Sequence, residues 1–303
     1  MYRLFGLILS IFVIMSKSIM NSFCLILCVV SSFFVTIHTQ VERYTEPQPD
    51  YSKWTELAPG VEYKESVAPI KSYLGDSKLS VLRLDPKRVE ADFFMATKHK
   101  TKSLNAYQWA DSFRLNIVCN ASMYELGKPL QSRGYLRAGS HANNAVFREN
   151  YRSAIVTNPK DTSEVNLQIL DLTCESWVRV QKEYDGIAQG LRMISCNGTA
   201  MSWNKRNQSC SMLVAAQDKK GWFYLIFTRS PYTHNEMIRF LKEMPEGIRN
   251  TIYLEGGPET SLLIDVNGHC IEKVGSWVSD TYERDDNYNF WRLPNVLGIK
   301  LKP

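Results

Sequence analysis

Short runs of apolar and alternating residues fill the chain after residue 54 and predict a domain built largely from strands. Residues 60–64 and 79–84 alternate between apolar and polar side chains, as strands with one buried face do. The runs 212–216 and 222–227 are apolar throughout, and the run 115–119 is apolar apart from Asn116, which is typical of buried strands. Three more strands are expected at 166–172, 189–194 and 250–255.

Two segments have the spacing of amphipathic helices. In residues 103–113 the apolar side chains can share one face, and Ser103 is a suitable N-cap. A second helix is expected from about His234 to Met244, capped by Thr233 and ended by Gly247. The chain shows no internal repeat. We therefore predict an α+β fold, a single mixed and strand-rich domain over residues 54–303 with a few helices packed on its sheets.

An apolar strand from Asn250 ends on the carboxylate of Glu255 and turns through Gly256, Gly257 and Pro258. A buried strand end presents its carboxylate at the rim of a core, and two glycines let a ligand approach the backbone closely. The alternative is an ordinary Gly-Pro turn between two strands.

Arg229 follows another apolar strand, and a predicted helix separates it from the strand that ends at Glu255. This strand, helix, strand order places Arg229 and Glu255 at the ends of strands that we expect to be neighbours. If the two strands are parallel, both side chains lie on the same rim of the sheet, where open sheets usually bind ligands.

The first forty residues differ in composition from the rest. They hold two apolar stretches and a few basic residues, among them Arg3 and Lys17, and no acidic residue. A basic residue before an apolar stretch is typical of a secretory signal, with Met15 or Met20 as a possible start. The stretch 19–37 is also long enough to span a bilayer, so an uncleaved anchor is the alternative. We expect an exported protein, periplasmic, secreted or anchored to the outer face of a membrane, with a linker at residues 41–53.

Composition and charge exclude two classes of protein. The chain has 303 residues, 44% of them hydrophobic, which is ample for one large core and argues against disorder. Its net charge is +5, and the basic residues are scattered rather than clustered. Nucleic-acid binding is therefore not expected. The sequence carries no signal for an oligomeric state.

Five cysteines lie outside the leader, and none of them has the CxxC spacing of a zinc or redox motif. They are Cys119, Cys174, Cys196, Cys210 and Cys270. Export permits a disulfide, and Cys196 with Cys210 is the expected pair; the alternative is that all five are buried thiols. His141 and His234 are isolated, so we expect no metal site and no cofactor. Asn120, Asn197 and Asn207 begin the Asn-X-Ser/Thr pattern of N-glycan acceptors.

Several short motifs occur in one order along the chain. They are Asn120 to Tyr124, Gln189 to Ile194, Asn197-Gly198, the small-residue strand before Lys219-Lys220-Gly221, and Tyr253 to Gly257. Together they resemble the phosphodiester glycosidase family from about Trp54 to the C-terminus. The chain departs from the family pattern where Glu255 replaces an Asp, where residues 120–124 replace Asn-x-Gly-Phe-Phe, and where an Arg usually opens the strand that here begins at Ser209.

The resemblance implies an exported hydrolase that cleaves a sugar-1-phosphodiester, in envelope or extracellular polysaccharide. Such a reaction needs a carboxylate to stabilise an oxocarbenium-like state or activate water, and we assign that role to Glu255. Glu259 is the second candidate, although a solvated turn residue is the simpler interpretation.

Phosphate recognition calls for arginines and for backbone N–H groups exposed by glycines. Arg229 is the expected catalytic cation, and Arg192 is expected to bind substrate together with Gly256 and Gly257; Arg133 and Arg137 are weaker candidates. Asn120 either fixes loop geometry or binds a sugar hydroxyl. The alternative function is a non-catalytic carbohydrate- or phosphate-binding envelope protein on the same fold.

Overall fold

The computed structural model describes residues 50–125, 128–204 and 207–302. The predicted leader, residues 1–40, and most of the predicted linker, residues 41–53, lie outside the described residues. From Tyr51 onward the chain forms one compact unit. Tyr51, which we had placed in the linker, packs edge-on against Tyr63, with ring centroids 4.9 Å apart.

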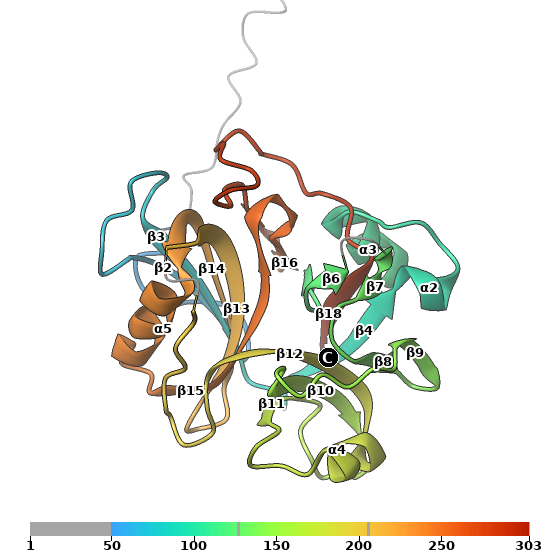
Figure 1. The fold of residues 1–303 in the computed structure, drawn as a ribbon. Helices are drawn as coiled ribbons and strands as arrows, with labels where there is room; N and C mark the ends of the chain where they lie inside the picture. Colours follow the sequence, from blue (N-terminus) through green and yellow to red (C-terminus); the bar gives the residue numbers. More distant parts are fainter. Residues whose placement is uncertain (1–49, 126–127, 205–206, 303) are drawn as a thin grey trace, which may run out of the picture. The chain divides into compact units, whose positions relative to one another are not determined.

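Nearly all strands of the described chain lie in two antiparallel sheets (Figure 1). The larger sheet follows the order β1 (Thr55–Ala58), β2 (Val61–Val67), β3 (Lys78–Leu84), β14 (Phe223–Thr233), β13 (Ser209–Asp218), β15 (Ile248–Gly256), β12 (Tyr184–Ile194), β10 (Ser153–Pro159) and β11 (Leu167–Asp171). Strand β8 (Leu136–Ala138) also pairs with β12 and carries β9 (His141–Asn144). The smaller sheet has the order β17 (His269–Val274), β16 (Ser261–Val266), β5 (Ile117–Asn120), β18 (Asn295–Leu301) and β4 (Val89–Met95).

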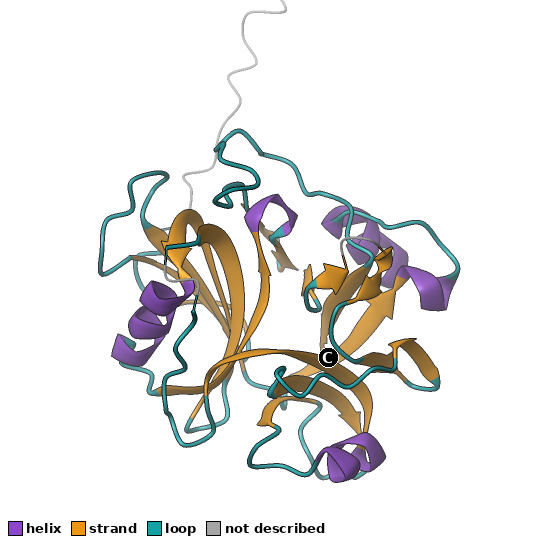
Figure 2. Ribbon diagram, viewed as in Figure 1, coloured by secondary structure: helices purple, strands orange, loops and turns teal. Residues whose placement is uncertain are grey.

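Short elements complete the described fold. They are the hairpin β6 (Tyr124–Glu125) and β7 (Lys128–Ser132), the helices α2 (Ala96–His99), α3 (Ala106–Phe113), α4 (Trp177–Glu183) and α5 (His234–Glu243), and the 3-10 turn η1 (Gly257–Glu259). Figure 2 shows these helices outside the strands. None of the helices within the described ranges is long and apolar enough to cross a membrane.

The side-chain pattern of the central strands explains the layers. In β13, Leu213 and Ala215 point into the main core shared with the smaller sheet, whereas Val214 and Ala216 belong to a second core under α5. A third cluster joins α3, through Trp109, to the outer face of the smaller sheet. Because the central strands are buried on both faces, they appear in the sequence as continuous apolar runs.

The predicted strand-rich domain with a few helices is confirmed, and the described fold is mainly β. Helix α5 begins where expected, with Thr233 and Glu236 forming a reciprocal capping box. The cap predicted for α3 is wrong: the helix begins after Asn105, whose side chain accepts a hydrogen bond from the Gln108 N–H. Asn105 and Gln108 form a capping box there, which Ser103 does not provide.

The expectation that β14 and β15 are direct neighbours is wrong, because β13 lies between them and pairs antiparallel with both. The two outer strands therefore run in the same direction. Thr228 and Gly256 are level with each other, since both lie opposite Met212. The chain thus brings the backbones of Arg229 and Glu255 to the same edge of the sheet, with one strand between them.

The predicted Cys196–Cys210 disulfide is also wrong, because Cys196 is bonded to Cys174. Cys210 is a buried free thiol in β13, where it lies 4.0 Å from the Tyr253 hydroxyl. Cys174 follows β11, and the disulfide fastens the turn after β12 to that edge strand.

Candidate active site

The corner between β15 and β16 is held in place by two asparagines. Asn120, at the end of β5, donates from Nδ2 to the Glu259 carbonyl at 3.0 Å and accepts from the Ser261 N–H at 2.8 Å. Asn287 donates from Nδ2 to the Pro258 carbonyl at 3.2 Å. The buried Asn120 amide thus acts on loop geometry, the first of the two roles expected for it, and both of its polar atoms are engaged by the backbone.

Two glutamates project from this corner and influence each other's charge. Burial, and next the nearby Glu259, raises the pKa of Glu255 to about 8, while the Gly256 N–H and Arg133 oppose the shift. Burial also raises the pKa of Glu259, against a hydrogen bond from the Tyr124 hydroxyl. Glu259 lies in the turn η1 but is only partly exposed, so it is not a fully solvated turn residue. A pKa of about 8 keeps the Glu255 carboxyl group largely protonated near neutral pH.

Tyrosines and arginines surround the two carboxyl groups. The pKa of Tyr124 is raised by burial and by both glutamates, and burial also raises the pKa of Tyr151 against the charges of Arg133 and Arg148. Arg148 forms an ion pair with Glu125 at 3.6 Å. Arg133 is exposed, and within the described residues no hydrogen bond or ion pair engages its guanidinium group. Arg133 is therefore available to bind an anion beside the glutamates.

At both glycines of the corner, other protein atoms occupy the space where a side chain would lie, so this space is not open to a ligand. A Cβ on Gly256 would lie 2.2 Å from the Tyr253 hydroxyl and 2.8 Å from the Cys210 sulfur. Gly257 has φ +76°, and a Cβ there would lie 3.0 Å from Val278. The Gly257 N–H donates to the Cys210 sulfur. Substrate binding by these glycines stays a prediction, although internal packing already accounts for their presence.

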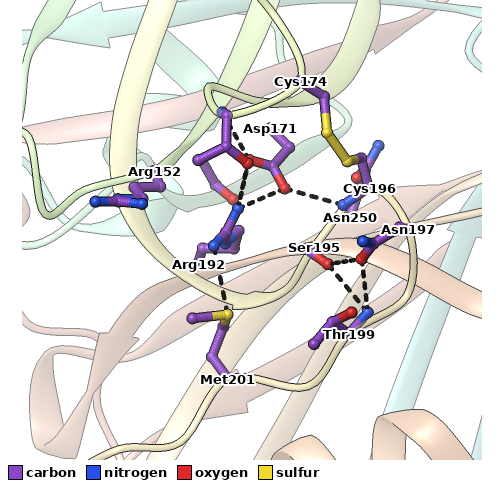
Figure 3. A network of polar contacts seen from close by, with 12 residues as sticks. Arg152, Asp171, Cys174, Arg192, Ser195, Cys196, Asn197, Thr199, Met201 and Asn250 are labelled. Carbon is purple, nitrogen blue, oxygen red and sulfur yellow. Dashed lines mark hydrogen bonds and ion pairs between the residues drawn. A yellow bond between two sulfur atoms is a disulfide. The ribbon is translucent and has the colours of Figure 1, made fainter.

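Arg192, predicted to bind substrate, is committed to a buried ion pair on another part of the sheet (Figure 3). Its Nη1 lies 2.6 and 2.7 Å from the two Asp171 carboxylate oxygens and 2.7 Å from the Thr173 hydroxyl. Its Nη2 contacts the Met201 sulfur at 3.4 Å. The structure therefore does not bring the Arg192 guanidinium to Glu255, because the strand-edge carboxylate Asp171 engages it first.

Arg229, predicted as the catalytic cation, is also engaged elsewhere. Its Nη1 donates to the carbonyls of Val274 and Asn287 at 2.9 and 2.8 Å, and its Nη2 pairs with Asp285 at 2.6 Å. These bonds fix the segment 274–288, which carries the Asn287 amide to the corner of Glu255. Arg229 reaches the right edge of the sheet but supports the site through this segment instead of facing it.

The sequence interpretation did not anticipate that Tyr124 and Tyr151 lie near the glutamates, and it ranked Arg133 below the other arginines. Tyr124 belongs to the motif 120–124, which was a usable signal. Arg133 and Tyr151 lie in a loop-rich region without periodicity, so no pattern connected them to Glu255.

The described residues contain one group of three potential metal ligands, formed by Asp171, Cys174 and Cys196. The two cysteines are joined in the disulfide, and Asp171 accepts two hydrogen bonds from Arg192. These contacts leave no open set of ligands at that position.

One family profile and two solved structures are similar to this chain. A family profile described as phosphodiester glycosidase matches residues 113–300. A hypothetical protein from Synechocystis has the same fold, with a TM-score of 0.60 and 11% identity over 85% of this chain. The alignment covers 64% of that protein, so this chain spans less than two thirds of its length.

A second structure of the same fold is the catalytic domain of zebrafish N-acetylglucosamine-1-phosphodiester alpha-N-acetylglucosaminidase, auto-inhibited by its pro-peptide. Its TM-score is 0.53 at 12% identity, over 81% of this chain and 85% of that domain. No curated protein matches the sequence.

Proposed function

The chain belongs to the phosphodiester glycosidase family, and we propose that it is an exported hydrolase that cleaves the bond between the anomeric carbon of a sugar and a phosphodiester oxygen. The proposal rests on the carboxyl pair Glu255 and Glu259, which is partly buried at one corner. The raised pKa of Glu255 keeps this member of the pair protonated. Pairs of titratable groups with different pKa values are the usual basis for dividing acid and base roles.

The two glutamates have different tasks in this reaction. As the bond from the anomeric carbon to oxygen breaks, positive charge develops on the sugar ring, and ionised Glu259 stabilises it. Tyr124 holds Glu259 in place through its hydroxyl. The phosphate monoester leaves with the bonding electron pair, and water then adds to the anomeric carbon and gives one proton to the Glu259 carboxylate, which later releases it to solvent.

Protonated Glu255 serves the anionic half of the substrate. A phosphodiester carries a negative charge, and two ionised carboxylates at the corner would repel it. The proton on Glu255 removes one of those charges and lets its O–H donate a hydrogen bond to a phosphate oxygen. The phosphate monoester that leaves has a second pKa of about 6, so it is a weak base and needs charge stabilisation more than full proton transfer.

Arg133 supplies the cation that the prediction had assigned to Arg229 and Arg192. Its guanidinium group lies within electrostatic range of Glu255 and Tyr151. A guanidinium fork matches the geometry of two phosphate oxygens. We assign Arg133 to the phosphate of the substrate.

Export, and attachment to a membrane through the N-terminus, belong to the same proposal and rest on the apolar composition of residues 1–40. An envelope or extracellular polysaccharide is the substrate that such a location would offer.

The deciding experiment measures sugar release from a panel of sugar-1-phosphodiesters. We expect turnover by the unsubstituted protein, a loss of about 10²- to 10³-fold in Glu259→Gln, and a smaller loss in Glu255→Gln, which keeps a neutral hydrogen-bond donor. Glu56→Gln, an exposed carboxylate on β1, is the matched control.

The alternative is a binding protein without catalysis, and one observation favours it: both expected arginines are engaged in ion pairs. Binding of the panel without turnover by the unsubstituted protein would establish that alternative. Equal turnover by all four proteins would remove both glutamates from the mechanism.

A further inference from the structure

A hollow of about 400 Å³ lies beside β12, the strand that pairs with β15. Its volume falls in the range of small-ligand sites. The residues that matter for its chemistry are Asn150, Arg152, Leu191, Met201, Ser202 and Trp203. Arg192 and Asn204 complete the lining.

This hollow lies near the end of the strand that carries Glu255, although neither glutamate is among its lining residues. Leu191 of β12 lies opposite Tyr253 of β15. Tyr253 is two residues before Glu255, a separation of roughly 7 Å along the strand. Tyr151, between the lining residues Asn150 and Arg152, is within electrostatic range of Glu255. A substrate of several sugar units is long enough to span this separation.

One wall is built on the buried Arg192 and Asp171 pair, beside which Arg152 lies in Figure 3. The Arg192 side chain is only 10% exposed and contacts Met201. The Cys174–Cys196 disulfide fastens the adjoining turn. This wall is fixed before any ligand binds, which lowers the entropic cost of binding.

The opposite wall is aromatic. The Trp203 ring stacks on His234, with centroids 3.9 Å apart and planes 7° from parallel, and meets Tyr253 edge-on at 5.7 Å. The Asn235 side chain accepts a hydrogen bond from the backbone N–H of Trp203 at 3.0 Å and donates one to the backbone carbonyl of Trp203 at 3.2 Å. These contacts fix the Trp203 ring at the edge of a polar hollow. A fixed aromatic ring beside polar groups is suited to binding a sugar ring.

The charge of the hollow is positive. Asp171 neutralises Arg192, and none of the described lining residues is acidic. Arg152 is exposed, and among the residues that the structure describes only its Nε is engaged, donating to the Glu149 carbonyl at 3.3 Å. Its two terminal NH₂ groups can form a bidentate contact with a carboxylate or a phosphate.

We propose that this hollow is a subsite for an anionic sugar unit of the chain whose phosphodiester is cleaved at Glu255 and Glu259. The proposal rests on the proposed function and narrows it: the substrate is an acidic or multiply phosphorylated glycan. Arg152 binds the carboxylate or phosphate of that unit, Trp203 contacts its ring, and Asn150 meets its hydroxyl groups.

The test compares kcat/KM for four substrates that share one cleavable sugar-1-phosphodiester. One carries a methyl group on the phosphate, and the others are extended by a neutral sugar, a uronic acid or a phosphorylated sugar. We expect an anionic extension to raise kcat/KM over the neutral extension by about 10- to 100-fold, and Arg152→Ala to abolish that ratio. Arg179→Ala, an exposed arginine on α4, should retain the ratio of the unsubstituted protein.

Comparing the uronic acid with the phosphorylated sugar identifies the anion. Equal kcat/KM for neutral and anionic extensions, or an unchanged ratio in Arg152→Ala, would overturn the proposal. If the unsubstituted protein cleaves none of the four, the proposed function fails and calorimetry with the two anionic oligosaccharides tests the subsite by itself. Binding that Arg152→Ala weakens about 10-fold or more would support the subsite, and absence of binding would overturn it.

Discussion

Replacing Glu255 by glutamine should stabilise the fold at neutral and alkaline pH and have little effect in acid. The folded protein raises the pKa of this carboxyl group from an ordinary value of 4.5 to about 8. Below pH 4.5 the group is protonated in both the folded and the unfolded state, so its ionisation does not lower the free energy of unfolding there. Between pH 4.5 and 8 only the unfolded state releases the proton, so the free energy of unfolding falls as pH rises.

The size of the effect follows from the shift. Each pKa unit corresponds to about 1.4 kcal/mol, so the cost of Glu255 is about 3 kcal/mol at pH 7 and levels off near 5 kcal/mol above pH 8. Glutamine has nearly the same shape and does not titrate. The Glu255→Gln protein should therefore exceed the unsubstituted protein in unfolding free energy by these amounts.

Urea unfolding at pH 5, 7 and 8.5, followed by tryptophan fluorescence with the disulfide intact, measures the difference. The control is Glu56→Gln on β1, where the exposed carboxylate should give a difference within about 0.5 kcal/mol at every pH. A stability difference between Glu255→Gln and the unsubstituted protein that is the same at all three pH values would refute the reasoning.

Three further outcomes are expected. Arg133→Ala should lower kcat/KM for a sugar-1-phosphodiester by about 10²- to 10³-fold, with partial recovery in Arg133→Lys, in a steady-state assay. Asp171→Asn leaves the Arg192 charge buried without its partner and should lower the free energy of unfolding by about 3 to 5 kcal/mol in urea titrations. Cys174→Ser opens a loop with a sequence separation of 22 and should cost about 3 kcal/mol by the same method, whereas Cys270→Ser, at an exposed free thiol, should cost little.

The strands and helix α5 could be predicted because their sequence signals lie within a few neighbouring residues. The apolar runs at 212–216 and 222–227 are buried on both faces, and Thr233 with Glu236 marks the start of α5 within four residues. Strand order is not local: β13 inserts between β14 and β15, and only the long-range pairing reveals it. The prediction therefore placed Arg229 and Glu255 on the correct edge of the sheet but with the wrong neighbours.

Side-chain direction limited the prediction of the site. Glu255 was identified because a carboxylate at a strand end followed by two glycines is visible in sequence. The engagement of Arg192 by Asp171 depends on a carboxylate 21 residues away, and that of Arg229 on an irregular segment with no pattern of its own. Arg133 was underrated because its distinguishing property, a guanidinium group that no other described residue engages, exists only in the folded chain.

The burial of Asn120 has a consequence for producing the protein. Asn120 begins an Asn-Ala-Ser acceptor pattern, yet it is 1% exposed and its amide Nδ2, the atom that would carry a glycan, is bonded to the Glu259 carbonyl. A eukaryotic secretory pathway modifies such patterns while the chain is still unfolded, and a glycan there would prevent β5 from meeting the corner it holds. Expression in a host without N-glycosylation avoids that outcome. In secretion from yeast or insect cells, chains glycosylated at Asn120 would fail to reach the native fold.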